Sequence, residues 1–87
     1  MGKRAIPSDE TTALRIARDY RNWANREIKF YREVSDSPIG IRILEEIRVM
    51  KSEIHDAIAG YTRVSEQAAY ILQQTEGRLE KFLGTAA

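Results

Sequence analysis

The chain has 87 residues and a mass of 10.0 kDa, the size of one small domain. Its 14 basic and 13 acidic residues leave a net charge of +1, which excludes an overall polyanionic or histone-like chain. The absence of cysteine excludes disulfides, thiolate zinc sites and a cysteine nucleophile. The longest uncharged stretch, residues 67–75, is too short and too polar to cross a membrane. These features predict a single cytoplasmic domain.

Residues 1–7 are predicted to form a short flexible arm that carries Lys3 and Arg4. Ser8 has the character of a helix N-cap, and the two acidic residues after it suit the positive end of a helix dipole. Because neither Gly nor Pro interrupts residues 8–34, we expect one helix over this range. Its apolar stripe, spaced as on one helix face, comprises Ala13, Ala17, Tyr20, Ala24, Tyr31 and Val34, flanked by Ile16, Trp23, Phe30 and Ile28.

Ser37 and Pro38 mark the start of a second helix, as N-cap and first helical residue. Apolar residues then recur at alternating spacings of three and four up to Phe82, a heptad pattern that extends over more than five repeats. Gly84 provides a stop, so a helix over residues 38–83 and a frayed tail over residues 84–87 are expected. Since strand alternation is absent, the sequence predicts an all-α antiparallel helical hairpin.

Gly60 is the one candidate break within the second helix, and two architectures stay open there. The heptad phase continues through Gly60 without a shift, which favours one long helix. A break near Gly60 would instead give three helices of similar length and a self-contained three-helix bundle.

The long-helix interpretation predicts a homodimer. A helix over residues 38–83 would be about 69 Å long, while residues 8–34 would cover only about half of it. The uncovered apolar stripe would then need a second chain, most simply as a two-fold dimer of hairpins. The predicted interface comprises Val64, Ala68, Ile71, Leu72, Leu79 and Phe82, with Trp23 and Phe30 as further anchors at the edge of the first helix.

No pattern for catalysis, for a metal or for a cofactor is found. The chain has no P-loop, no G-x-G-x-x-G and no G-x-S-x-G motif. His55 is the only histidine, and its neighbours three and four residues away include no carboxylate. Glu53 and His55 stand two residues apart and therefore point to different faces of a helix, which does not suit a metal site. We expect no enzyme, no cofactor and no small-molecule substrate.

Two charged residues fall on core-facing positions. Glu27 interrupts the apolar face of the first helix, and Lys51 interrupts the heptad seam. One allowed register of the hairpin places them side by side, so they are interpreted as a pair that fixes register. Extension of both side chains to the surface, or an acid–base role for Glu27, are the alternatives.

The polar face of the first helix is mostly basic. Residues 1–34 contain eight basic and five acidic residues, whereas residues 35–87 carry a net charge of −2. The face comprises Arg15, Arg18, Asn22, Asn25, Arg26, Lys29 and Arg32. Such residues can contact phosphates and base edges, or an acidic protein, or simply keep the helix soluble. The sequence favours a non-enzymatic protein–protein interaction module, with a nucleic-acid-binding regulator as the alternative.

Overall fold

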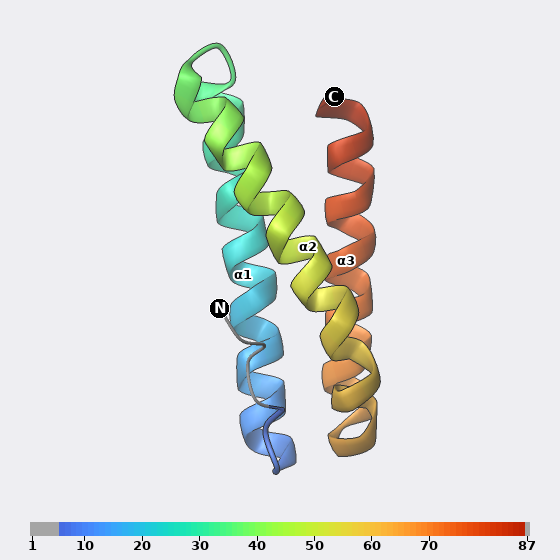
Figure 1. Ribbon diagram of the computed structural model, residues 1–87. Coiled ribbons are helices and arrows are strands. Elements are labelled where there is room, and N and C mark those ends of the chain that lie inside the picture. Colours follow the sequence, from blue (N-terminus) through green and yellow to red (C-terminus); the bar gives the residue numbers. More distant parts are fainter. Residues whose placement is uncertain (1–5, 87) are drawn as a thin grey trace.

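The computed structural model describes residues 6–86 and contains three helices: α1 (Glu10–Val34), α2 (Pro38–Val64) and α3 (Glu66–Ala86). α2 runs antiparallel to α1 and α3, so the C-terminal ends of α1 and α3 lie at the same end of the bundle (Figure 1). No strand occurs within residues 6–86, and the prediction of an all-α fold is confirmed. Residues 1–5 of the predicted arm and Ala87 of the predicted tail lie outside the described residues.

α1 begins one residue later than the sequence suggested, because Asp9 and not Ser8 is its N-cap. The backbone of Asp9 is extended, and its carboxylate accepts a hydrogen bond from the backbone N–H of Thr12 at 2.9 Å. This hydrogen bond lowers the pKa of Asp9 below its usual value because it stabilises the charged form. The carboxylate therefore satisfies one of the free donors at the start of the helix.

The turn between α1 and α2 occupies residues 35–37, as the Ser37–Pro38 pair indicates. The hydroxyl and the backbone N–H of Ser37 both donate to the carbonyl oxygen of Val34, at 2.8 and 3.0 Å. Gly40 lies so close to α1 that a Cβ atom there would be 2.7 Å from the same carbonyl oxygen. A glycine at this position lets the two helices approach closely where they join.

The single long helix over residues 38–83 is wrong, because the chain turns back at Ser65. Ser65 has an extended backbone, and its N–H still donates to the carbonyl of Tyr61 at 2.8 Å, which completes the last turn of α2. Its hydroxyl accepts from the N–H of Ala68 at 3.1 Å and thereby caps α3. One residue thus ends one helix and begins the next. The alternative of a three-helix bundle is confirmed, although its turn lies at Ser65. Gly60, the candidate break, lies within α2, where it faces the side chain of Ile6.

The core lies along the axis between the three helices. α1 contributes mainly small residues, whereas α2 and α3 contribute large aliphatic ones, so the helices interlock at close range. The largest fully buried side chains are Ile47, Ile54, Leu72 and Leu79. Each contributes about 1.5–3 kcal/mol through burial of apolar surface. The bundle is 42 Å long in its greatest dimension, well short of the about 69 Å of the single long helix.

The stripe that was predicted to need a second chain is covered by the same chain. Ala68, Leu72 and Leu79 are buried in the core, and Val64, Ile71, Phe82 and Trp23 are half-buried against it. Phe82 also contacts Tyr31 of α1 edge to face, with 5.4 Å between ring centroids. Only Phe30 among the predicted interface residues is exposed. The physical reason for expecting a dimer is therefore absent, and the homodimer itself stays a prediction.

Candidate functional site

A groove lined with cations runs between the C-terminal halves of α1 and α3. Lys29 and Arg32 come from α1, and Arg78 and Lys81 come from α3. Its other lining residues are Asn25, Ile28, Phe82 and Thr85. These eight residues define the basic groove, which has a volume of about 600 Å³ and no carboxylate in its lining.

The cations of the basic groove form no ion pair with any described residue. Across residues 6–86, the ion pairs join Arg15 to Asp19, Arg48 to Glu45 and His55 to Glu76, and none involves the groove. Arg78 instead donates a hydrogen bond to the amide oxygen of Asn25 across the two helices, at 2.5 Å. This neutral partner holds the guanidinium in place and leaves its charge available.

The direction of the helices favours one of these four charges. Because α1 and α3 are parallel, both of their C-terminal ends lie at this end of the bundle (Figure 1). A helix C-terminus carries partial negative charge and favours nearby cations, and Arg32 lies in the last turn of α1. The dipole of α1 thus favours Arg32, whereas the other three cations lie before the last turns of their helices.

The basic face predicted on the first helix divides between two surfaces. Asn25, Lys29 and Arg32 line the basic groove. Arg15 and Arg26 instead line a second groove, between α1 and α2. The remaining two residues of the predicted face, Arg18 and Asn22, are exposed and line neither groove.

Sequence reasoning missed the half of the basic groove that α3 contributes. Arg78 and Lys81 lie beside α1 only because the chain turns back at Ser65. One signal was present: Arg78 is the single charged residue in a series that recurs every seven residues and otherwise comprises Ile43, Met50, Ala57, Val64 and Ile71. An arginine at the margin of an apolar stripe indicates that the stripe ends there at a polar surface of the neighbouring helix.

The predicted register pair of Glu27 and Lys51 is wrong. Glu27 faces Glu46 of α2, whereas Lys51 lines a cleft between α2 and α3. Partial burial raises the pKa of Glu27 above its usual value, and a hydrogen bond and charge repulsion from Glu46 raise it further. A hydrogen bond between two carboxyl groups needs a shared proton, so this contact is weakest when both groups are ionised.

His55 finds a carboxylate partner that its own helix does not supply. Its Nδ1 lies 2.7 Å from a carboxylate oxygen of Glu76 on α3, in the cleft that Lys51 and Ser52 also line. The imidazole is 70% exposed, and no hydrogen bond joins it to Ser52 in the described part of the chain. The pair links α2 to α3 at the surface.

Comparison with known proteins finds no family model, no curated protein and no solved structure that matches this chain. Among the described helices, none has both the length and the apolar character that a membrane span requires. No cluster of three or more histidine, aspartate or glutamate side chains suited to a metal ion occurs between residues 6 and 86. The basic groove is the surface whose composition points most clearly to a ligand.

Proposed function

We propose that this protein is a non-enzymatic binding module whose basic groove holds the phosphate backbone of a nucleic acid. The observation that carries the proposal is the lining itself: four cations from two helices meet without a carboxylate among them. Lys and Arg side chains that neutralise phosphates release condensed counterions, which is the main source of affinity for nucleic acids.

The other polar groups of the groove suit the same ligand. Asn side chains commonly donate hydrogen bonds to phosphate oxygens, and the amide N–H groups of Asn25 stand among the four cations. The hydroxyl of Thr85 donates to the carbonyl oxygen of Phe82 at 3.0 Å. The exposed Arg18 and Asn22 extend the positive surface along α1, toward its N-terminus. Contacts of this kind position a backbone and carry no base sequence, so binding with little sequence preference is expected.

The test adds the protein to labelled DNA and RNA of about 20 nucleotides, single-stranded and duplex, and measures the fluorescence anisotropy of the label. The salt concentration is about 50 mM, where phosphate contacts are strong. The double variant Arg78→Glu/Lys81→Glu reverses the α3 side of the groove and is expected to lose about tenfold or more in affinity. Its matched control is Arg42→Glu/Arg63→Glu, which changes the net charge equally at exposed positions of α2 outside the groove.

The two variants separate a local site from a general charge effect. The proposal requires the α3 variant to lose much more affinity than the α2 control. Equal losses would mean that only the net charge matters, and the absence of binding to every probe by the unmodified protein would refute the proposal.

A further inference from the structure

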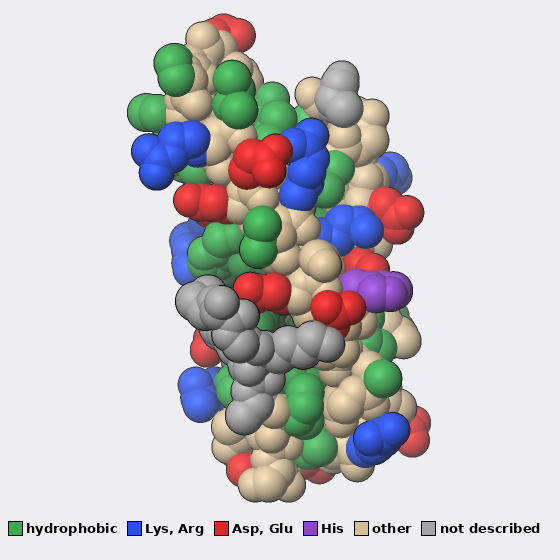
Figure 2. All heavy atoms as spheres, viewed as in Figure 1, with side chains coloured by type: hydrophobic (Ala, Val, Ile, Leu, Met, Phe, Trp, Pro, Cys, Tyr) green, Lys and Arg blue, Asp and Glu red, His purple; other side chains and the backbone are tan. Residues whose placement is uncertain are grey.

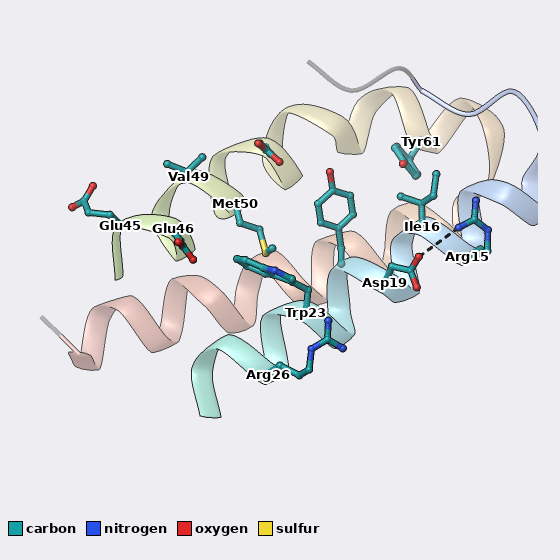
Figure 3. A pocket seen from close by; sticks show the side chains of 12 residues that line it. Arg15, Ile16, Asp19, Trp23, Arg26, Glu45, Glu46, Val49, Met50 and Tyr61 are labelled. Atoms are coloured by element: carbon teal, nitrogen blue, oxygen red, sulfur yellow. Dashed lines mark ion pairs between the residues drawn. The ribbon is translucent and has the colours of Figure 1, made fainter. Parts of the chain in front are cut away.

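A second groove, between α1 and α2, combines an apolar floor with an acidic edge. It has a volume of about 710 Å³, and its floor includes Trp23 and Met50, whose side chains lie against each other (Figure 3). Val49, on the α2 edge, is 58% exposed, and Phe30, seven residues after Trp23 on the same face of α1, is 41% exposed. Apolar side chains are therefore presented to solvent along one side of the bundle.

The α2 edge of this groove carries two carboxylates that form no ion pair with the described residues. Glu46 and Glu53 lie one turn before and one turn after Val49, and neither forms an ion pair within residues 6–86. Of the two arginines on the α1 side, Arg15 pairs with Asp19 at 3.6 Å (Figure 3), and Arg26 forms no ion pair within residues 6–86. On the face shown in Figure 2, acidic and hydrophobic side chains lie next to each other.

The contact between Glu27 and Glu46 places a further carboxyl group close to the α2 edge, where burial and Glu46 raise the pKa of Glu27 and the charge of Arg26 lowers it. The two carboxyl groups face each other across α1 and α2, and their mutual repulsion opposes the ionisation of Glu27. A cation placed beside Glu46 would remove this repulsion, because an opposite charge within about 4–6 Å favours the ionised form. Within residues 6–86, no ion pair compensates the charge of Glu46.

We propose that the groove between α1 and α2 binds a positively charged amphipathic helix of a partner protein. The apolar side of that helix packs on Trp23, Met50 and Val49, and its Lys or Arg side chains pair with Glu46 and Glu53. The seven-residue separation of Glu46 and Glu53 corresponds to about 10.5 Å of helix, which matches anchors at positions i, i+3, i+4 and i+7 of a bound helix. This surface lies on the other side of α1 from the basic groove and is independent of it.

The experiment titrates the protein with a synthetic 18-residue amphipathic helix of Leu and Lys, and with the same pattern in Leu and Glu. Trp23 is the only tryptophan, so its emission reports directly on the floor of the groove. The Leu–Lys peptide is expected to bind and to shift this emission to the blue. Glu46→Gln/Glu53→Gln is expected to weaken its affinity about tenfold, and Val49→Ser about threefold.

Glu33→Gln/Glu80→Gln is the matched control, since it removes two exposed carboxylates outside the groove. It should bind within about twofold of the unmodified protein if the pairing is local. The proposal is overturned if the Leu–Lys peptide does not bind, if the Leu–Glu peptide binds equally well, or if both double variants lose affinity equally. Self-association of the protein that only Glu46→Gln/Glu53→Gln abolishes would assign the groove to a second copy and would also overturn it.

Discussion

Replacement of Ser65 by alanine tests how the chain divides its second half into two helices. Ser65 is 4% exposed, and its hydroxyl accepts from the N–H of Ala68, a residue with no exposed surface. It also donates to the carboxylate of Glu10 at 3.2 Å, which connects the starts of α1 and α3. Alanine removes both hydrogen bonds and leaves the N–H of Ala68 without its partner.

The expected cost is about 2 kcal/mol, because loss of a capping side chain costs about 0.5–2 kcal/mol and a buried donor without a partner costs about 1–3 kcal/mol. In a domain of this size, that corresponds to a fall in Tm of about 8–16 °C. Thermal unfolding followed by circular dichroism measures it. Ser52→Ala, at an exposed position within α2, is the matched control and should change Tm little. A Tm for Ser65→Ala within about 2 °C of the unmodified protein would refute the role given to Ser65.

Three further predictions concern the core, the glycines and the carboxyl pair. Leu79→Ala should lower the free energy of unfolding by about 2–5 kcal/mol in urea titrations, since Leu79 has no exposed surface. Gly77→Ala should raise it by about 1 kcal/mol because a Cβ there meets nothing within 4 Å, whereas Gly40→Ala should lower it by about 1–3 kcal/mol because its Cβ would meet a backbone carbonyl of α1. The raised pKa of Glu27 means that the folded state binds the proton more tightly, so stability from this group is lost as pH rises above the usual glutamate range. Glu27→Gln should therefore raise Tm at pH 7 and leave it nearly unchanged at pH 4; an equal change at both pH values would contradict the contact with Glu46.

Local sequence patterns were sufficient for the first helix and for the turn that follows it. The stripe that contains Ala13, Ala17 and Ala24 identifies the buried face of α1, because helical periodicity fixes which residues share a side. Ser37 and Pro38 locate the start of α2, because proline is suited to the first helical position. Both signals depend only on neighbouring residues.

The turn at Ser65 could not be read from the same kind of pattern. Ser65 occupies a seam position of the heptad, so the apolar spacing continues across it without a shift. The serine ends α2 only because its backbone is extended and its hydroxyl caps α3, and both features depend on how α3 packs on α1. The available signal was that Ser65 is polar at a seam position, whereas the stronger helix-breaking tendency belongs to Gly60, which lies inside α2.

The candidate site was predictable to the extent that it belongs to one helix. Asn25, Lys29 and Arg32 lie on the predicted basic face, whereas Arg78 and Lys81 join them only after the turn at Ser65 brings α3 back beside α1. The predicted pairing of Glu27 with Lys51 was wrong for a related reason. With three helices in place of a hairpin, Lys51 faces the cleft with α3 and Glu46 faces α1.

The salt dependence of nucleic-acid binding tests the central claim most directly, because it counts the phosphates that the basic groove neutralises. For a duplex, each phosphate contact contributes about −0.9 to the slope of log K against log salt concentration. Replacement of Lys29, Arg32, Arg78 and Lys81 by glutamine should therefore make the slope less negative by about 3–4. An unchanged slope, with circular dichroism showing that the variant is folded, would contradict the assignment of the groove as the nucleic-acid site.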